Sequence, residues 1–217
     1  MAAGIDVSAQ RGYHIIWHLA HAGTLVFGPT RGGRQLFALS ERWLPPAASI
    51  ERDDALKLLA RRYFSGHGPA TAADLTRWAN LTVADTKRAI AAALPELTTL
   101  NVDGIEYLLG SETQEVLTAN RRDAERVLAL PHFDELLLGY RDRGPTLPPE
   151  RDFNVFANRN GVPAHTIVHR GQVIATWKRP EQASGAGVEV LPLVPATAAV
   201  LDRAAARASE ISGRTVE

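Results

Sequence analysis

Residues 130–143 read LPHFDELLLGYRDR, and the rest of the chain is organised around this stretch. Its apolar residues between Phe133 and Tyr140 are spaced to share one side of a helical turn, which predicts a short helix packed on a core. Gly139 allows the chain to bend after this turn, so the charged run 141–143 should emerge at its end. We expect a junction whose apolar half joins the domains on either side and whose charged half faces a concave surface.

The composition is typical of a soluble globular protein, with 45% hydrophobic and 22% charged residues in a chain of 217. No run of 18 apolar residues exists, so we expect no membrane contact, and the first residues lack the pattern of a secretory signal. The chain has no cysteine, which excludes disulfides and thiol catalysis and favours a cytoplasmic location.

The charged residues are unevenly distributed although the net charge is zero. Residues 1–50 and 121–180 are net basic, whereas residues 51–120 and 181–217 are net acidic. A non-specific polyanion-binding protein would be more basic overall. Any contact with nucleic acid should therefore be local, within the two basic segments.

The first fifty residues predict a helix over 9–22 and a hairpin of strands 24–27 and 35–39. A glycine-rich loop carrying Arg31 and Arg34 joins the strands. A helix followed by a hairpin with a basic tip is the second half of a winged-helix unit, whose helix can enter a DNA groove. The helix also has a polar stripe that includes Arg11 and His18. This stripe suits solvent or phosphates better than a metal, because a straight helix spreads its three histidines over about 10.5 Å.

A second unit follows the proline-rich linker at 45–49 and has every part of a winged helix. Helices are predicted over 53–64, from Thr71 to Trp78 and over 82–94, and strands 96–100 and 106–109 flank an Asp-Gly turn. The segment is net acidic and Asp103 lies at its hairpin tip. We therefore expect this unit to pack more than to contact DNA, although its third helix offers Lys87 and Arg88.

The remaining residues predict a β-rich domain that ends in a helix. Residues 111–129 should be helical, 144–149 an extended loop, and 162–169 with 172–177 a hairpin. One more strand over 188–194 should precede an alanine-rich helix that starts at Pro195. The fold class expected is α+β, with a partial winged helix over 1–46, a complete one over 47–115 and a C-terminal β-rich domain over 116–217.

Four features then coincide in order: the wing that ends in ERWLP at 41–45, the full winged helix, the stretch PHFD…GYRDR at 131–143, and GQVIATW at 171–177. Together they resemble the AlkZ/YcaQ-like family of tandem winged-helix proteins, whose known members are bacterial DNA glycosylases for alkylated bases and interstrand crosslinks. The resemblance covers residues 9–210. It implies a concave DNA-binding scaffold, a role in DNA repair, and a catalytic Gln-x-Gln or Gln-x-Asp motif in an N-terminal region.

The sequence departs from this family at the catalytic motif. None of its five glutamines is followed two residues later by Gln or Asp. Because the first winged-helix unit is only half formed, we expect this chain to lack the family's N-terminal part. Asp134 and Asp142 are the carboxylates of the central stretch, and we expect Asp142 to order the arginines beside it. We assign no catalytic residue, no cofactor and no metal ligand; no nucleotide-binding, serine-hydrolase or zinc-protease motif is present.

The leading hypothesis is a DNA-binding protein related to these glycosylases, without complete catalytic machinery in this chain. The alternatives are an active DNA glycosylase whose glutamine motif lies outside this chain, and a protein-interaction or regulatory module without DNA contact. We expect a partner chain, a second copy or the C-terminal domain to cover residues 9–44. The residues expected to contact double-stranded DNA are Arg11, His18, Arg31, Arg34, Arg141, Arg143, Arg170, Lys178 and Arg179.

Overall fold

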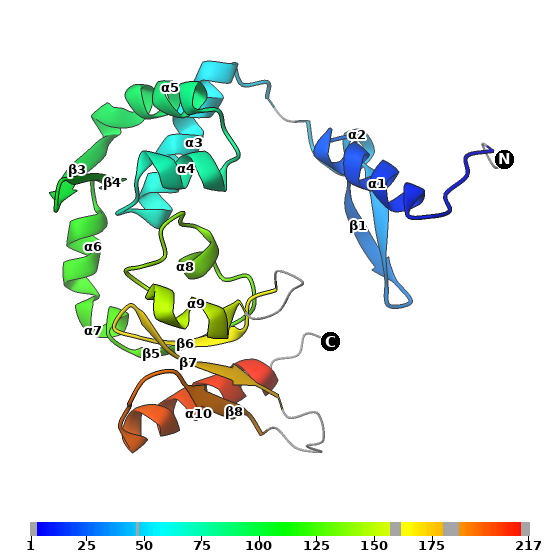
Figure 1. Cartoon of the computed structure of the whole chain (residues 1–217). Coiled ribbons are helices and arrows are strands. Elements are labelled where there is room, and N and C mark those ends of the chain that lie inside the picture. Colours follow the sequence, from blue (N-terminus) through cyan, green and yellow to red (C-terminus); the bar gives the residue numbers. More distant parts are fainter. Residues whose placement is uncertain (1–3, 47, 157–161, 180–186, 214–217) are drawn as a thin grey trace. The chain divides into compact units, whose positions relative to one another are not determined.

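The chain is a mixed α+β protein, which agrees with the α+β class expected from the sequence (Figure 1). Its described residues form three small antiparallel sheets. The computed structural model describes residues 4–46, 48–156, 162–179 and 187–213. The chain divides into two compact units, Met1–Ile50 and Glu51–Glu217. Each unit is described by itself below.

The first unit consists of helix α1 (Arg11–His21), the hairpin of β1 (Leu25–Arg31) and β2 (Arg34–Leu39), and a single turn of helix, α2 (Ser40–Trp43). The strands extend further than the sequence indicated, so that Arg31 pairs with Arg34 at the end of the ladder. The turn between them is Gly32-Gly33, and both glycines have positive φ, which other residues rarely adopt. No residue in the described part of this unit is buried.

The second unit begins with three helices and a hairpin, as the sequence predicts. They are α3 (Arg52–His67), α4 (Ala72–Trp78), α5 (Val83–Ala93), the short helix η1 (Leu94–Glu96), β3 (Leu97–Val102) and β4 (Ile105–Gly110). The expected capping box is confirmed, because Thr71 and Asp74 each accept a hydrogen bond from the other's backbone N–H. The helices and β4 enclose a core that contains Tyr63, Phe64 and Leu75, all almost fully buried.

The segment after this hairpin differs from the expected helix over 111–129. Helices α6 (Thr113–Ala119) and α7 (Arg121–Ala124) end early, and β5 (Val127–Leu130) is a strand. Val127 and Ala129 are buried while Leu128 is exposed, so tertiary pairing with the next strand overrides the local helical preference. Helix α9 (Pro149–Val155) was also missed; it begins with a proline at its first position, where proline is favourable.

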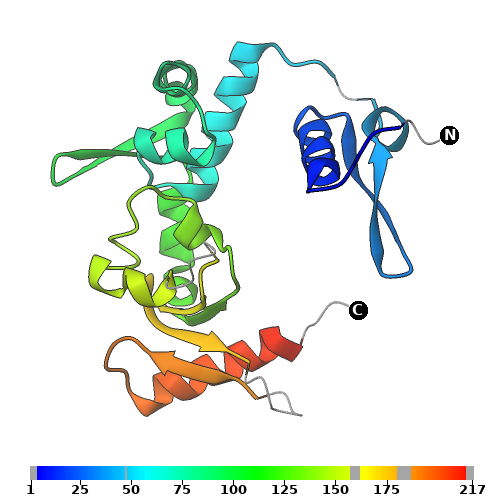
Figure 2. The ribbon, with the colours of Figure 1, turned by 45° about the vertical axis from the view of Figure 1, so that its right-hand side comes forward.

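A four-stranded sheet completes the second unit, in the order β5-β6-β7-β8 with every pair antiparallel. The predicted hairpin is confirmed as β6 (His165–His169) and β7 (Gln172–Lys178), and β8 (Glu189–Pro192) is the last strand. Helix α10 (Ala198–Gly213) runs along one face of this sheet (Figure 2) and starts later than the expected Pro195. Its Val200, Ala204 and Ala208 pack with the apolar side chains of β5 to β7.

The stretch 130–143 joins the α3–α5 helices to this sheet. Its helical turn, α8 (Glu135–Leu138), buries Leu137 in a cluster with residues of α9, β6 and β7. On the other side the Tyr63 hydroxyl donates to the Gly139 carbonyl at 2.7 Å. The Tyr140 hydroxyl donates to the His67 carbonyl at 2.7 Å. The junction is therefore confirmed, but Phe133, expected in its apolar cluster, is 57% exposed with φ 57°.

The junction requires glycine at position 139 because there is no room for a side chain. A Cβ atom there would lie 2.7 Å from both the Glu135 carbonyl oxygen and the His67 ring, closer than real Cβ contacts come. The backbone of the bend therefore packs directly against the end of α3. This close approach is what brings the following charged residues beside α4.

Candidate nucleic-acid interface

The three charged residues that follow the bend go to three different environments. The Arg141 backbone N–H donates to the Asp74 Oδ1 at 2.6 Å, and its side chain lines a groove along α4 and α5. Asp142 lines a separate cleft, whose lining also includes the Arg143 side chain. The Arg143 guanidinium pairs with Asp152 at 3.1 Å and lies 4.3 Å from the centre of the Phe156 ring. Three neighbours in sequence therefore contact three different parts of the molecule.

Asp142 does not order the adjacent arginines as the sequence suggested. Its Oδ1 accepts the Gly144 backbone N–H at 2.8 Å, and no salt bridge to it is found among the described residues. The reason is the tight turn at 142–144, which uses the carboxylate as its cap. Arg143 finds its carboxylate on α9 instead, on a helix that the sequence pattern did not predict.

The groove that Arg141 enters is basic and has a volume of about 430 Å³. Small side chains of α4 and α5 form its floor, and Arg77, Lys87 and Arg141 supply the charge. Arg77 donates to the Tyr140 carbonyl at 2.8 Å, which ties α4 to the junction. Within the described part of the chain, neither Lys87 nor Arg141 has a carboxylate within salt-bridge distance. These two side chains are therefore available to an anion.

Lys87 and its neighbour Arg88 differ in this respect. Arg88 pairs with both Asp53 and Asp85, and Arg52 reaches the same Asp85 at 2.8 Å. Arg88 is consequently part of an ion network between α3 and α5. Lys87 instead lines the groove. The sequence places both residues on one helix but does not show which of them forms salt bridges.

Asp74 holds the groove and the junction together. Its side chain is 4% exposed and accepts the Thr71 backbone N–H at 2.7 Å and the Thr71 hydroxyl at 2.8 Å, in addition to the Arg141 N–H. Burial, and then the negative charges of Asp74 and Glu135, raise the pKa of Tyr140. The same causes, with Tyr140 added, raise the pKa of Tyr63.

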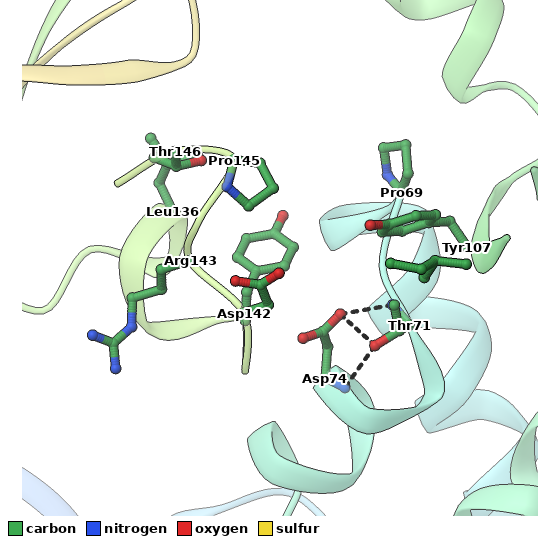
Figure 3. Close-up of a pocket in the computed structure, with 11 residues that line it drawn as sticks. Pro69, Thr71, Asp74, Tyr107, Leu136, Asp142, Arg143, Pro145 and Thr146 are labelled. Carbon is green, nitrogen blue, oxygen red and sulfur yellow. Dashed lines mark hydrogen bonds between the residues drawn. The ribbon is translucent and has the colours of Figure 1, made fainter. Parts of the chain in front are cut away.

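A cleft of about 290 Å³ opens between the junction and the β3–β4 hairpin. Figure 3 shows Pro69, Tyr107 and Thr71 on one wall and Leu136, Asp142 and Pro145 on the other. The carboxylates of Asp74 and Asp142 face the space between the walls, whereas the Arg143 guanidinium turns away from it (Figure 3). The cleft thus combines apolar and aromatic walls with negative charge.

The two hairpin tips carry opposite charges. Arg31 and Arg34 are both exposed at the tip of β1–β2, and no carboxylate within the described residues pairs with either. At the tip of β3–β4 the turn is Asp103-Gly104, both with positive φ. The basic tip presents two free guanidinium groups, the side chain best suited to phosphate.

The other residues expected to contact DNA belong to several different helices and strands. On α1, Arg11 lies 3.7 Å from Asp6 and His18 is exposed. Arg170, at the β6–β7 turn, lies 3.8 Å from Glu125. Lys178 pairs with Glu189 at 3.2 Å, and Arg179 beside it is exposed. Within the second unit, the basic groove adds Lys87 and Arg77 to the basic residues near Arg141, although the net charge of residues 51–120 is acidic.

Two histidines stack at the edge of the C-terminal sheet. The ring centroids of His132 and His165 are 3.5 Å apart, and that of His165 lies 4.3 Å from Trp177. Burial, followed by the charges of His132 and Arg179, lowers the pKa of His165 to about 4. No group of three potential metal ligands occurs among the described residues, and none of their helices is long and apolar enough to cross a bilayer.

Residues 4–211 match the model of the family described as DNA glycosylase AlkZ-like, and the chain belongs to this family. The fold is shared with a solved structure, the DNA glycosylase AlkZ of Streptomyces sahachiroi, at a TM-score of 0.79 and 24% sequence identity. That match covers 95% of this chain but 56% of the AlkZ chain, so this chain spans little more than half of its length. No curated protein matches the sequence.

Proposed function

We propose that this chain binds double-stranded DNA, as a winged-helix relative of the glycosylases that act on alkylated or crosslinked DNA. The observation that carries the proposal is membership of the AlkZ-like family over almost the whole chain. Under this proposal α3 to α5 with β3–β4 form a complete winged helix. Helix α1 with β1–β2 forms the second half of another, and residues 116–217 form a C-terminal domain.

Two sets of free basic side chains support phosphate contact. Arg31 and Arg34 project from the β1–β2 tip, and Lys87 and Arg141 line the groove beside α5. In a winged helix, the third helix and the hairpin tip are the parts that approach the duplex. The sequence led us to expect this 47–115 unit to pack more than to contact DNA. The groove favours DNA contact, because Asp85 is paired with Arg52 and Arg88 while Lys87 has no carboxylate partner among the described residues.

The first unit supplies the second part of the proposal, a covering partner for residues 9–44. Tyr13, Trp17, Phe27 and Trp43 are each more than half exposed, and the unit has no buried residue of its own among those described. A unit of this size rarely holds its shape without a core. We propose that a further apolar surface, from another chain or from protein outside this sequence, packs on these side chains.

A mobility-shift titration of the whole chain with an unmodified duplex tests DNA binding. The affinity should fall linearly with the logarithm of the salt concentration, because phosphate contacts release counterions. Lys87→Ala with Arg141→Ala should weaken binding and reduce the salt slope by about two. Arg62→Ala with Arg122→Ala, two exposed arginines elsewhere, is the matched control. No shift at low salt would favour a protein-interaction module and refute the proposal.

A second candidate function is base excision, with the catalytic glutamine motif supplied by residues outside this chain. Membership of a glycosylase family favours it, while none of the five glutamines here stands in a Gln-x-Gln or Gln-x-Asp motif. Incubation with an alkylated duplex, followed by detection of abasic sites, separates the two. We expect no base release from this chain alone; release above the uncatalysed rate would make it an enzyme.

A further inference from the structure

We propose that a second groove, in the C-terminal part of the second unit, is a docking site for an extended acidic segment of a partner protein. This α7–α10 groove lies where α7, the start of β5 and α10 meet (Figure 1), and its volume is about 610 Å³. It shares no lining residue with the basic groove beside α5. The proposal therefore concerns a protein partner and a surface that the proposed DNA contact does not use. The charged residues that line the groove are Arg122, Glu125, Arg126, Arg203, Arg207 and Glu210.

Two arginines on opposite walls of the groove are available to a ligand. Arg122 lies on α7 and Arg203 lies on α10, and both are exposed. Within the described part of the chain, neither has a carboxylate within salt-bridge distance. Every cation of the groove other than the half-buried His169 is an arginine, the side chain whose planar fork binds a carboxylate through two parallel hydrogen bonds. A ligand with two acidic groups can therefore be held from both sides.

The other two arginines are held only by carboxylates three residues away in sequence. Arg126 pairs with Asp123 at 2.8 Å, and Arg207 pairs with Glu210 at 2.8 Å. All four side chains are at least half exposed. Exposed ion pairs of this kind contribute little to stability, because water screens them. A carboxylate of a ligand can therefore share or replace them at small cost.

The length of the groove favours an extended segment. Arg203, Ala206, Arg207 and Glu210 are spaced to share one face of α10. This face extends over two helical turns, or about 10.5 Å. An extended peptide advances by about 3.3 Å per residue, so about three residues can lie along it. A single small anion would contact only part of this row.

The two glutamates of the groove favour a peptide over a phosphodiester chain. Glu125 and Glu210 line it together with the arginines. They repel a chain with a negative charge at every unit, whereas they can accept hydrogen bonds from the backbone N–H groups of a peptide. A phosphodiester backbone has no such donors. The small apolar side chains of Val127 and Ala206 also line the groove and suit a segment in which acidic and small residues alternate.

The test is calorimetric titration of the whole chain, at low salt, with a capped peptide of five aspartate–alanine repeats. Arg122→Ala with Arg203→Ala should weaken its binding by about tenfold, because two ion pairs are lost. Arg62→Ala with Arg121→Ala is the matched control, since both arginines are exposed and neither lines the groove. It should leave the affinity unchanged. No binding by the wild type, or an equal loss in both variants, would overturn the proposal.

Two further titrations test whether the groove recognises a peptide backbone. The same peptide with N-methylalanine in place of alanine keeps every carboxylate but loses half of its N–H donors, and it should bind about fivefold more weakly. Single-stranded hexathymidylate carries the same five negative charges and should not displace the acidic peptide. Equal binding of the methylated peptide, or displacement by hexathymidylate, would identify a general anion site and overturn the assignment to a protein segment.

Duplex binding separates this proposal from the proposed function. The slope of log affinity for unmodified duplex against log salt should be the same in the wild type and in the Arg122/Arg203 variant. A smaller slope in the variant would place the groove in the DNA interface and overturn its assignment to a protein partner. Absence of duplex binding by the wild type, with the acidic peptide still bound, would count against the proposed function alone.

Discussion

The two hairpins of this chain share an arrangement but differ in burial and charge. In each, a helix is followed by two antiparallel strands: α1 with β1–β2, and α5 with β3–β4. The second is supported by α3 and α4, and Tyr63 and Phe64 are almost fully buried there. The first has no buried residue among those described, and its tip carries two arginines where the second carries Asp103. The local sequence pattern is sufficient to predict a helix and a hairpin in both regions. Only the second region has additional helices that enclose a hydrophobic core.

One aromatic substitution in each region should show the largest difference in the free energy of unfolding. Phe64→Ala should destabilise the second unit by about 4 kcal/mol, because it leaves a cavity in a packed core. Trp17→Ala, on the half-exposed face of α1, should change stability by no more than about 0.5 kcal/mol. Urea denaturation followed by circular dichroism measures both. Comparable losses would mean that the first unit has a core, and would remove the need for a covering partner.

Substituting a buried and an exposed aspartate of the second unit should give a smaller difference in the free energy of unfolding. Asp74→Asn should cost about 2 kcal/mol, because one carboxylate accepts bonds from Thr71 and Arg141 and an amide group cannot satisfy all of these donors. Asp103→Asn should be neutral, since asparagine adopts positive φ readily. The same denaturation experiment applies. A neutral Asp74→Asn would show that this carboxylate does not hold the junction.

Acid should weaken the second unit through His165. The pKa of an unfolded histidine near 6.5 falls to about 4 in the folded chain, so between these values only the unfolded state is protonated. Stability should therefore fall as the pH decreases from about 6.5 to about 4. His165→Phe keeps a ring between His132 and Trp177 but does not titrate. Its denaturation midpoint should depend less on pH in this window; an identical dependence would exclude His165 as the cause.

Features with local causes could be predicted from the sequence. The capping box at Thr71 and Asp74, the Asp103-Gly104 turn and the bend at Gly139 each depend on residues a few positions apart. Strand β5 was missed because its conformation depends on pairing with β6, some forty residues later. Phe133 was misplaced because periodicity alone does not reveal a residue with positive φ at the entrance to a helix.

The candidate sites depended on contacts that no local pattern shows. Arg141 and Lys87 line one groove although they are far apart in sequence. Arg143 is paired with Asp152 on α9, a helix that the sequence did not reveal. The cleft needs Tyr107 from β4 opposite Asp142 from the junction. The distribution of charge in the sequence predicted that basic residues contact DNA. The folded structure determines which of them are paired with carboxylates and which are available to phosphate.

The salt dependence of duplex binding tests the central claim most directly. Arg31→Ala with Arg34→Ala should weaken binding and lower the slope of log affinity against log salt by about two, one for each lost phosphate contact. Arg121→Ala with Arg122→Ala removes the same charge from exposed positions on α7 and should leave the slope unchanged. A slope that is the same in wild type and the Arg31/Arg34 variant would contradict this claim and remove the β1–β2 tip from the interface.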